Sequence, residues 1–188
     1  MLLAPEEALA MDVHGRTDSA VLAPLYVDGA GELHAVFTRR RDDLKRHPGE
    51  ISFPGGRQEP GETLIETALR EAHEEVGLPP DAVEVIGALA PVGTFVTNYA
   101  IYPFVGLIEP GFEWIAQETE VAEVLEFSLD ALVAGHSLKR LVRRGMAFKT
   151  DVYEVDGHMV WGATSRILTD LLNRLEVGPR RPWRLEQE

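Results

Sequence analysis

The stretch GRQEPGETLIETALREAHEEVGL, from Gly56 to Leu78, decides the fold of this chain. From about Thr63 to Val76 its pattern is helical, because apolar residues recur at the spacing of one helix face. These apolar residues are Leu64, Ala68 and Ala72. Gly77 then supplies the glycine that commonly ends a helix, and Pro79 prevents the helix from continuing. The segment therefore predicts a helix with a defined C-terminal end.

Three glutamates on this helix carry its chemistry. Glu71, Glu74 and Glu75 stand at positions i, i+3 and i+4, so their carboxylates project from neighbouring points of one face. Like charges at this spacing repel one another and destabilise a bare helix. A hard divalent cation, Mg²⁺ or Mn²⁺, would offset the repulsion, because these ions prefer oxygen ligands. The alternative is an ordinary solvated helix face, on which Arg70 pairs with Glu74.

The wider spacing of the segment separates these two alternatives. Seven positions fall in a fixed pattern: Gly56, Glu62, Arg70, Glu71, Glu74, Glu75 and Gly77. At roughly 7% frequency per residue type, such a match arises by chance in a chain of this length about once in a million. The pattern resembles the Nudix box, which covers residues 56–78 here. Ala72 stands where that family has isoleucine, leucine or valine, and it is still an apolar residue that favours helices.

The resemblance to the Nudix family implies both a fold and a mechanism. The fold is of the α/β class, an α/β/α sandwich with a mixed β-sheet, in which the box forms a loop-helix-loop that carries the metals. Glu71, Glu74 and Glu75 would bind Mg²⁺ or Mn²⁺ and act in catalysis. Arg70 and Glu62 would orient the loop and the helix. The metals would neutralise the charge of a diphosphate and activate a water for attack on phosphorus.

The residue that accepts the proton of this water lies either within the box or in a loop outside it. Glu118 and Glu120 occupy the loop before a predicted strand, where Nudix enzymes often place an additional metal ligand or base. Glu120 is the preferred catalytic candidate of the two. The alternative for either residue is an exposed glutamate without a role in catalysis.

The segment VFTRRRDDLKRHPGEISFPGG, from Val36 to Gly56, narrows the substrate. It resembles the motif that precedes the box in coenzyme A diphosphatases. The matching residues are Thr38, Arg40, Gly49, Phe53, Pro54, Gly55 and Gly56, and the departures are Val36, Phe37, Arg41 and Lys45. Lys45 replaces an arginine and cannot form the two-pronged phosphate contact of a guanidinium. The resemblance implies hydrolysis of coenzyme A to 3′,5′-ADP and 4′-phosphopantetheine.

Five of the 18 basic residues lie within eight positions of this motif: Arg39, Arg40, Arg41, Lys45 and Arg46. Coenzyme A carries a 3′-phosphate as well as its diphosphate, and such a cluster could hold these phosphates. The residues expected to bind substrate phosphates are Arg39, Arg40, Arg41, Lys45, Gly55 and Gly56. The alternative is a solvated loop in which Asp42 and Asp43 balance the positive charge.

The rest of the chain predicts strands mixed with two substantial helices, in one domain that spans residues 1–188. Strands are expected at 20–27, 33–38, 83–91, 100–109, 122–127, 147–155 and 158–160, with a short helix from Leu129 and a longer one from about Trp161 to Leu175. The basic group from Lys139 to Arg144 is expected on a helix face or in a loop. The uncharged stretch from Val85 to Ile108 is long enough to span a bilayer, but its glycines and prolines favour two buried strands.

Composition limits the partners of the chain. The formal net charge of −13 would repel a nucleic acid or an anionic membrane, so a small nucleotide substrate is expected and neither of those partners is. Because the sequence has no cysteine, it forms no disulfide, thiolate zinc site or cysteine nucleophile, and this fits a cytoplasmic location. The family resemblance is also compatible with a homodimer.

Two other functions stay open. The chain could be a Nudix hydrolase that prefers ADP-ribose, a dinucleotide such as NADH or a nucleoside triphosphate, because the box itself is silent on the substrate. It could also be a non-catalytic Nudix domain used for ligand sensing or protein binding. Such domains commonly lose box carboxylates, whereas Glu71, Glu74 and Glu75 are all present. The upstream motif favours coenzyme A over these alternatives.

Overall fold

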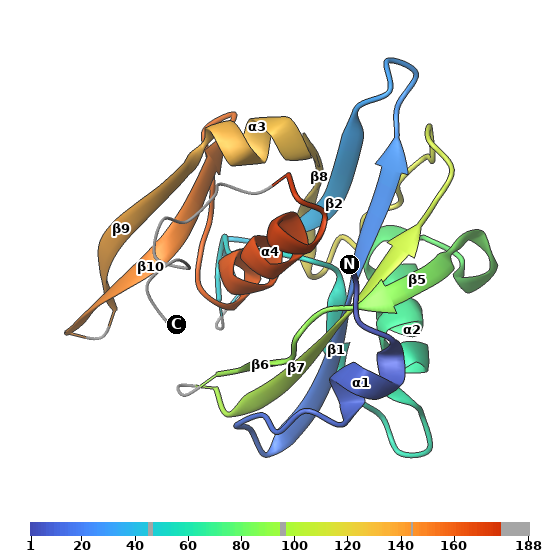
Figure 1. Cartoon of the computed structure of the whole chain (residues 1–188), viewed down its shortest axis with the longest axis horizontal. Helices are drawn as coiled ribbons and strands as arrows, with labels where there is room; N and C mark the ends of the chain where they lie inside the picture. The colour runs from blue at the N-terminus through green and yellow to red at the C-terminus, as the bar shows by residue number, and fades with distance from the viewer. Residues whose placement is uncertain (45–46, 95–96, 144, 178–188) are drawn as a thin grey trace.

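A computed structural model describes residues 1–44, 47–94, 97–143 and 145–177 of the chain. In this part, a mixed sheet of eight strands forms the centre of the molecule (Figure 1). Its strands are β1 (Thr17–Val27), β2 (Leu33–Arg40), β3 (Ile51–Ser52), β4 (Gly55–Arg57), β5 (Glu84–Ala88), β6 (Val92–Gly93), β7 (Tyr99–Leu107) and β8 (Val121–Ser128). The strand order is β3-β2-β1-β7-β5, with β4 paired to β1, β6 to β7 and β8 to β2.

A second sheet and a set of helices complete the described part of the chain. The second sheet has the order β11-β10-β9, and its long hairpin extends away from the central sheet (Figure 1). Its strands are β9 (His136–Arg143), β10 (Met146–Val155) and β11 (His158–Val160). The helices are α1 (Pro5–Leu9), α2 (Leu64–Val76), the 3₁₀ turn η1 (Pro80–Ala82), α3 (Leu129–Ala134) and α4 (Ala163–Arg174). Within the described ranges, no helix is both long enough and apolar enough to cross a membrane.

The central sheet is mixed because β1 has neighbours of both orientations. β1 runs parallel to β7 over nine residue pairs, from Thr17 opposite Tyr99 to Leu25 opposite Leu107. It runs antiparallel to β2 and to β4. A parallel pair needs a long crossover connection, and the chain between β1 and β7, which includes α2, provides it. The expected mixed sheet is confirmed.

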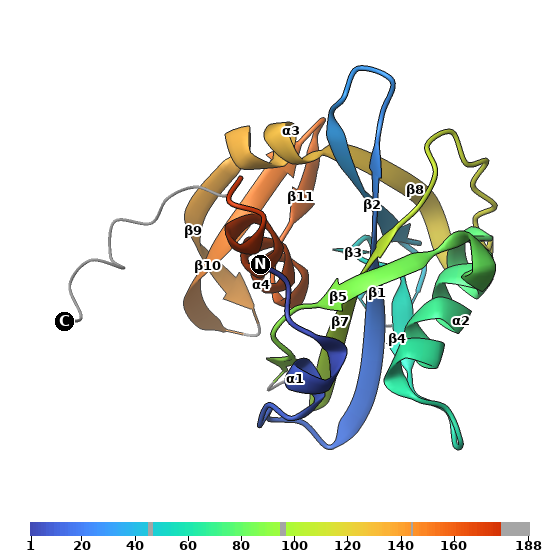
Figure 2. The same ribbon diagram turned by 45° about the vertical axis from the view of Figure 1, so that its right-hand side comes forward.

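Both faces of β1 are buried, each under a different helix. Successive side chains of a strand point to opposite faces. Ala20 and Leu22 accordingly join one buried cluster with the apolar face of α2, and Ala23 and Leu25 join a second cluster with α4. Figure 2 shows α2 and α4 on either side of the central sheet. The predicted α/β/α arrangement is therefore confirmed.

The prediction for the basic group Lys139–Arg144 was wrong. This group lies in strand β9 as far as Arg143, and Arg144 lies outside the described residues. Leu138 and Val142 recur at a helical spacing of four, yet both side chains are largely exposed. Exposure alternates along β9, but its exposed positions carry Leu138, Arg140 and Val142, so the apolar residues do not mark the covered face and the sequence lacks the pattern typical of a half-buried strand. What holds β9 is an antiparallel ladder of eight residue pairs with β10.

The other predicted strands and helices are present, with ends shifted by at most three residues. The sequence did not predict α1, η1, β3, β4 and β6. Each of these elements has five residues or fewer, which is too short for a periodic pattern. The unpredicted strand β4 matters most, because it lies against the predicted metal-binding helix α2.

Candidate active site

Helix α2 is held by a cap at each end and by one buried face. The Thr63 hydroxyl accepts a hydrogen bond from the Glu66 backbone N–H (3.3 Å), and the Glu66 carboxylate accepts one from the Thr63 backbone N–H (2.7 Å). Gly77 ends the helix in the left-handed conformation, with φ of 76°. Ala72 is fully buried in the cluster shared with β1, so its small side chain suits a close contact between helix and sheet.

Arg70 ties the loop before α2 to the helix. Its Nε donates to Glu62 Oε1 (2.6 Å), and its Nη2 donates to the carbonyl oxygen of Arg57 (3.1 Å). Glu62 also accepts hydrogen bonds from the Thr67 hydroxyl (2.9 Å) and the Glu59 backbone N–H (3.1 Å). The hydrogen bond from Arg70 is the main reason that the pKa of Glu62 falls to about 2. Through these contacts Arg70 and Glu62 hold the loop against the helix.

Glu71 projects from α2 towards β4. Its Oε1 accepts a hydrogen bond from Arg70 Nη1 (3.0 Å). A Cβ atom on Gly56 would overlap both carboxylate oxygens of Glu71, so only glycine leaves room for this side chain. Burial raises the pKa of Glu71, and the hydrogen bond from Arg70 opposes that rise.

Glu75 is the most deeply buried of the three glutamates, with 9% of the residue exposed. Its Oε2 accepts a hydrogen bond from the Gly55 backbone N–H (3.1 Å). Burial raises the pKa of Glu75 to about 8, and the negative charges of Glu71 and Glu120 add to this rise. The Gly55 N–H and the positive charge of Arg40 oppose it. A buried carboxylate with so little compensating positive charge favours the approach of a proton or a cation.

Glu74 lies at the outer edge of the group. Its side chain is 56% exposed, and its Oε2 accepts a hydrogen bond from Arg70 Nη1 (3.2 Å). This is the i, i+4 pair of an ordinary helix surface, although Arg70 shares its guanidinium with Glu62 and Glu71 as well. Loss of the Glu74 charge should therefore change the stability of the metal-free protein less than loss of the Glu75 charge.

Arg40 and Glu120 face the carboxylates of α2 from the ends of two paired strands. Arg40 is the last residue of β2, Glu120 immediately precedes β8, and Arg40 Nη1 lies 3.4 Å from Glu120 Oε2. Both charges act on the pKa of Glu75, so both residues lie close to that carboxylate. Glu118, the other candidate base, has its backbone carbonyl bound by Arg41 Nη1 (2.8 Å). The negative charge of Glu120 thus acts on both Glu71 and Glu75, while Glu118 binds Arg41 through its carbonyl oxygen.

The other basic side chains of the predicted phosphate cluster pair with nearby acids. Arg41 donates to both oxygens of Asp43 (2.8 Å each), and Arg39 donates to Asp42 (3.2 Å). Two further members of the cluster lie outside the described part of the chain: Lys45 and Arg46. The balancing role considered for Asp42 and Asp43 is therefore present, whereas Arg40 pairs with Glu120 and its positive charge lowers the pKa of Glu75.

Two features beside the site were not anticipated from the sequence. The Thr67 hydroxyl supports Glu62, and a T-x-x-E signature one turn earlier, Thr63 to Glu66, could have located this end of the helix. An open groove of about 830 Å³, lined in part by Trp114 and Ile115, lies next to the site. The sequence signal for this groove is the pair of large apolar residues, Trp114 and Ile115, within an acidic loop.

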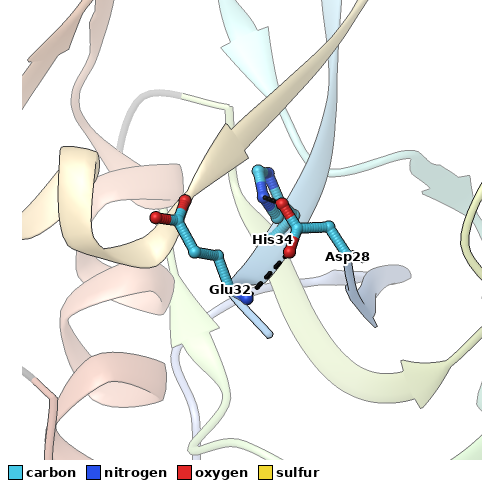
Figure 3. A group of neighbouring side chains, drawn as sticks. All are labelled: Asp28, Glu32 and His34. Carbon is cyan, nitrogen blue, oxygen red and sulfur yellow. Dashed lines mark hydrogen bonds and ion pairs between the residues drawn. The ribbon is translucent and has the colours of Figure 1, made fainter. Parts of the chain in front are cut away.

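A separate group of potential metal ligands lies in the turn between β1 and β2 (Figure 3). One ligand atom each of Asp28, Glu32 and His34 lies within 4.8 Å of the others. Asp28 already accepts hydrogen bonds from the backbone N–H groups of Ala30 and Glu32 (2.8 Å each) and lies 3.1 Å from His34 Nε2. These hydrogen bonds explain why the three side chains lie together: they order the turn of the hairpin between β1 and β2. Arg40 stands six residues further along β2, about 20 Å away, so this group is distinct from the α2 site.

Comparison with known proteins identifies the family. The profile described as the NUDIX domain matches residues 16–146, more than half of the chain. The chain belongs to the Nudix family. A curated relative of this Nudix protein, "Uncharacterized Nudix hydrolase NudL" from Enterobacter sp. (strain 638), is 38% identical over 182 residues. That alignment covers 95% of this chain and 92% of the relative.

Solved structures share the Nudix fold at low sequence identity. A MutT/nudix family protein from Enterococcus faecalis has a TM-score of 0.59 and 15% identity, over 85% of this chain and 62% of that one. The NUDIX domain of Shewanella oneidensis NrtR, complexed with ADP ribose, has a TM-score of 0.50 and 18% identity, over 64% of this chain and 77% of that one. At these identities the likeness supports the fold alone. By its family, the chain is a Nudix hydrolase, an enzyme that acts on pyrophosphate bonds, and such enzymes generally use divalent metal ions.

Proposed function

We propose that this Nudix hydrolase cleaves the diphosphate linkage of coenzyme A and produces 3′,5′-ADP and 4′-phosphopantetheine. One observation carries the proposal: the motif resembling that of coenzyme A diphosphatases packs against the carboxylates of α2. Gly55 donates a hydrogen bond to Glu75, and Gly56 leaves the room that Glu71 occupies. The positive charge of Arg40, the last residue of β2 and part of the same motif, lowers the pKa of Glu75. Motif and box thus form one site, so a substrate preference set by the motif would act on the bond that the box cleaves.

The carboxylates of α2 fit a hard divalent cation. Glu71 and Glu75 are both largely withdrawn from solvent, and carboxylate oxygens are the ligands that Mg²⁺ and Mn²⁺ prefer. The missing Cβ of Gly56 leaves Glu71 free to occupy this position. Glu71, Glu74 and Glu75 would hold the ion. When bound, it supplies positive charge against the diphosphate and makes water a better nucleophile.

The side chains around α2 have separate roles in the proposed reaction. Glu120 accepts a proton from water as the water oxygen bonds to phosphorus. The bond from that phosphorus to the bridging oxygen breaks, and the bridging oxygen leaves with the other phosphate. Arg40, 3.4 Å from Glu120, orients this carboxylate and offers positive charge to a substrate phosphate. Arg70 and Glu62 are positioning residues, because they fix the loop that precedes the helix.

The basic cluster would bind the remaining phosphates of coenzyme A. Arg39 is paired with Asp42 and would exchange this aspartate for a substrate phosphate, whereas Arg41, held by both oxygens of Asp43 and by the Glu118 carbonyl, would keep its ion pair. Such an exchange costs little free energy, because exposed ion pairs contribute little to stability. Lys45, together with the backbone at Gly55 and Gly56, would complete the phosphate-binding set.

A second substrate class is ADP-ribose, the ligand with which the NrtR domain was solved, although the likeness to that domain supports the fold alone. NADH and nucleoside triphosphates stay as further alternatives within the family. A non-catalytic binding module is disfavoured, because all three box carboxylates are present and Glu71 and Glu75 lie together with Arg40 and Glu120.

The proposal is tested by the kcat/KM of the purified protein for coenzyme A, ADP-ribose, NADH and dGTP, each with Mg²⁺ or Mn²⁺. We expect coenzyme A to exceed the other three by at least about tenfold, which is the ratio that a difference of about 1.4 kcal/mol produces. A preference for ADP-ribose would show that the proposed substrate is wrong. In parallel, Glu74→Gln should lose most turnover while staying folded. If the wild-type protein binds coenzyme A but does not turn it over, the protein is a binding module.

A further inference from the structure

An open groove of about 830 Å³ lies between the loop that follows β2 and the loop that precedes β8. We call it the Trp114 groove. Its apolar lining consists of Trp114, Ile115, Ala116, Val121 and Ala122. Both loops lie at one end of the central sheet, near the C-terminal end of α2.

The Trp114 groove begins where the catalytic side chains end. Arg40 reaches the Glu120 carboxylate, and the next residue, Arg41, lines the groove. The Arg41 backbone N–H donates to the Glu120 carbonyl oxygen (3.0 Å). On the other strand, Glu120 is followed directly by Val121 of the groove. A group bound in the groove and a diphosphate bound at α2 can therefore belong to one substrate molecule.

The apolar wall of the groove is held in place: Val121 is only 4% exposed and Trp114 packs against the buried cluster of α2, while Ile115 faces solvent. Trp114 packs against Phe112, with ring centroids 4.9 Å apart. Ile115 is 70% exposed, yet its backbone N–H donates to the Val76 carbonyl oxygen at the end of α2 (3.0 Å). When a ligand covers a large apolar side chain that is fixed in place and exposed to water, the burial of that side chain stabilises the complex.

The charges of the groove disfavour a phosphate. Among the residues that the structure describes, Asp42, Asp43 and Glu118 line it together with one guanidinium, that of Arg41. This guanidinium is already bound by both oxygens of Asp43 and by the Glu118 carbonyl. The net charge of the described lining is therefore negative, so a bound phosphate would face repulsion. The carboxylates of Glu118 and of Asp42, which Arg39 holds in the free protein, can instead accept hydrogen bonds from amide N–H or hydroxyl groups.

We propose that the Trp114 groove binds the pantetheine arm of coenzyme A, an inference that rests on the proposed function. The arm is uncharged and carries methyl and methylene groups, which match the apolar wall. Its amide N–H groups and its hydroxyl match the carboxylates of Asp42 and Glu118. The other half of coenzyme A carries the 3′-phosphate, which the charge of the groove disfavours. The nucleoside half therefore lies on another side of the catalytic carboxylates.

The test replaces Ile115 by serine and measures inhibition by each half of the substrate. Wild-type turnover of coenzyme A is established first, and the inhibition constants of 4′-phosphopantetheine and 3′,5′-ADP are then compared. Ile115→Ser should raise the inhibition constant of 4′-phosphopantetheine about fivefold, equivalent to about 1 kcal/mol of lost contact, and leave that of 3′,5′-ADP unchanged. The matched control is Val142→Ser on β9, because Val142 is 71% exposed and lies outside the groove. It should change neither constant.

Each other outcome overturns the inference in a recognisable way. If Ile115→Ser weakens 3′,5′-ADP instead, the groove holds the nucleoside half. If neither constant changes while the wild-type protein cleaves coenzyme A, the groove is no part of the binding site and the proposed function stands. If the wild-type protein does not cleave coenzyme A, the proposed function fails and the inference fails with it. Equal melting temperatures of the two variants show that the comparison is between folded proteins.

Discussion

Replacing the buried Glu75 by glutamine should stabilise the metal-free protein at high pH while removing its activity. The pKa of Glu75 is about 8 in the folded protein, against an ordinary value of 4.5. Because the folded value is the higher one, the contribution of Glu75 to stability is fully present below pH 4.5 and is lost as the pH rises through 8. Between pH 6 and pH 8 this loss amounts to about 1.4 kcal/mol per pH unit, and it levels off above pH 8. From pH 6 to pH 9, Glu75 should thus cost the wild-type protein about 2–3 kcal/mol.

The assay is urea unfolding followed by circular dichroism in EDTA at pH 6 and pH 9. Glu75→Gln should lack the loss of about 2–3 kcal/mol, because the amide keeps an oxygen for the Gly55 N–H but cannot ionise. The matched control is Glu74→Gln, whose side chain is 56% exposed and whose pH profile should follow that of the wild-type protein. Added Mg²⁺ should raise the stability of the wild-type protein at pH 9 more than that of Glu75→Gln. Equal pH profiles for wild type and Glu75→Gln would refute the burial argument.

Three further predictions concern the loop and helix around this carboxylate. Gly56→Ala should lower kcat/KM, measured by steady-state kinetics, by about 100-fold, because the added Cβ displaces the Glu71 carboxylate. The control Gly29→Ala, with open space around the added Cβ, should leave kcat/KM unchanged. Arg70→Lys should destabilise the protein by about 1–2 kcal/mol, since an ammonium cannot replace the guanidinium contacts to Glu62, and an unchanged urea midpoint would contradict this. Glu62→Gln should reduce the loss of stability at acid pH, because the contribution of Glu62 is fully present above pH 4.5 and is lost as the pH falls through about 2. Unfolding experiments between pH 5 and pH 2 should therefore show a smaller fall in the free energy of unfolding for Glu62→Gln than for the wild-type protein.

The sequence predicts most of the fold because the long elements carry periodic patterns. Helix α2 combines apolar spacing with a terminal glycine, and strands β1 and β7 are runs of buried apolar residues. The sequence does not predict the basic strand β9, which pairs with the next strand β10, because Leu138 and Val142 lie at its exposed positions and apolar residues therefore do not mark its covered face. The two-residue strand β3 and the three-residue strand β4 were missed because they are shorter than any period.

The candidate site was predictable in composition but not in arrangement. The box spacing marked Glu71, Glu74 and Glu75, yet only the fold shows that Glu75 is buried, Glu74 is half exposed and Glu71 depends on Gly56. The sequence groups the basic residues as one cluster, whereas in the structure Arg40 pairs with Glu120 and its neighbours Arg39 and Arg41 pair with aspartates. A single domain over residues 1–188, a cytoplasmic location and a homodimer stay predictions.

The most direct test of the central claim is to incubate the purified protein with coenzyme A and Mg²⁺ or Mn²⁺ and to separate the products by chromatography. The account predicts equal amounts of 3′,5′-ADP and 4′-phosphopantetheine in the wild-type reaction, and neither product with Glu75→Gln. Intact coenzyme A beside a cleaved ADP-ribose or NADH control would contradict the substrate assignment and leave the Nudix hydrolase in place.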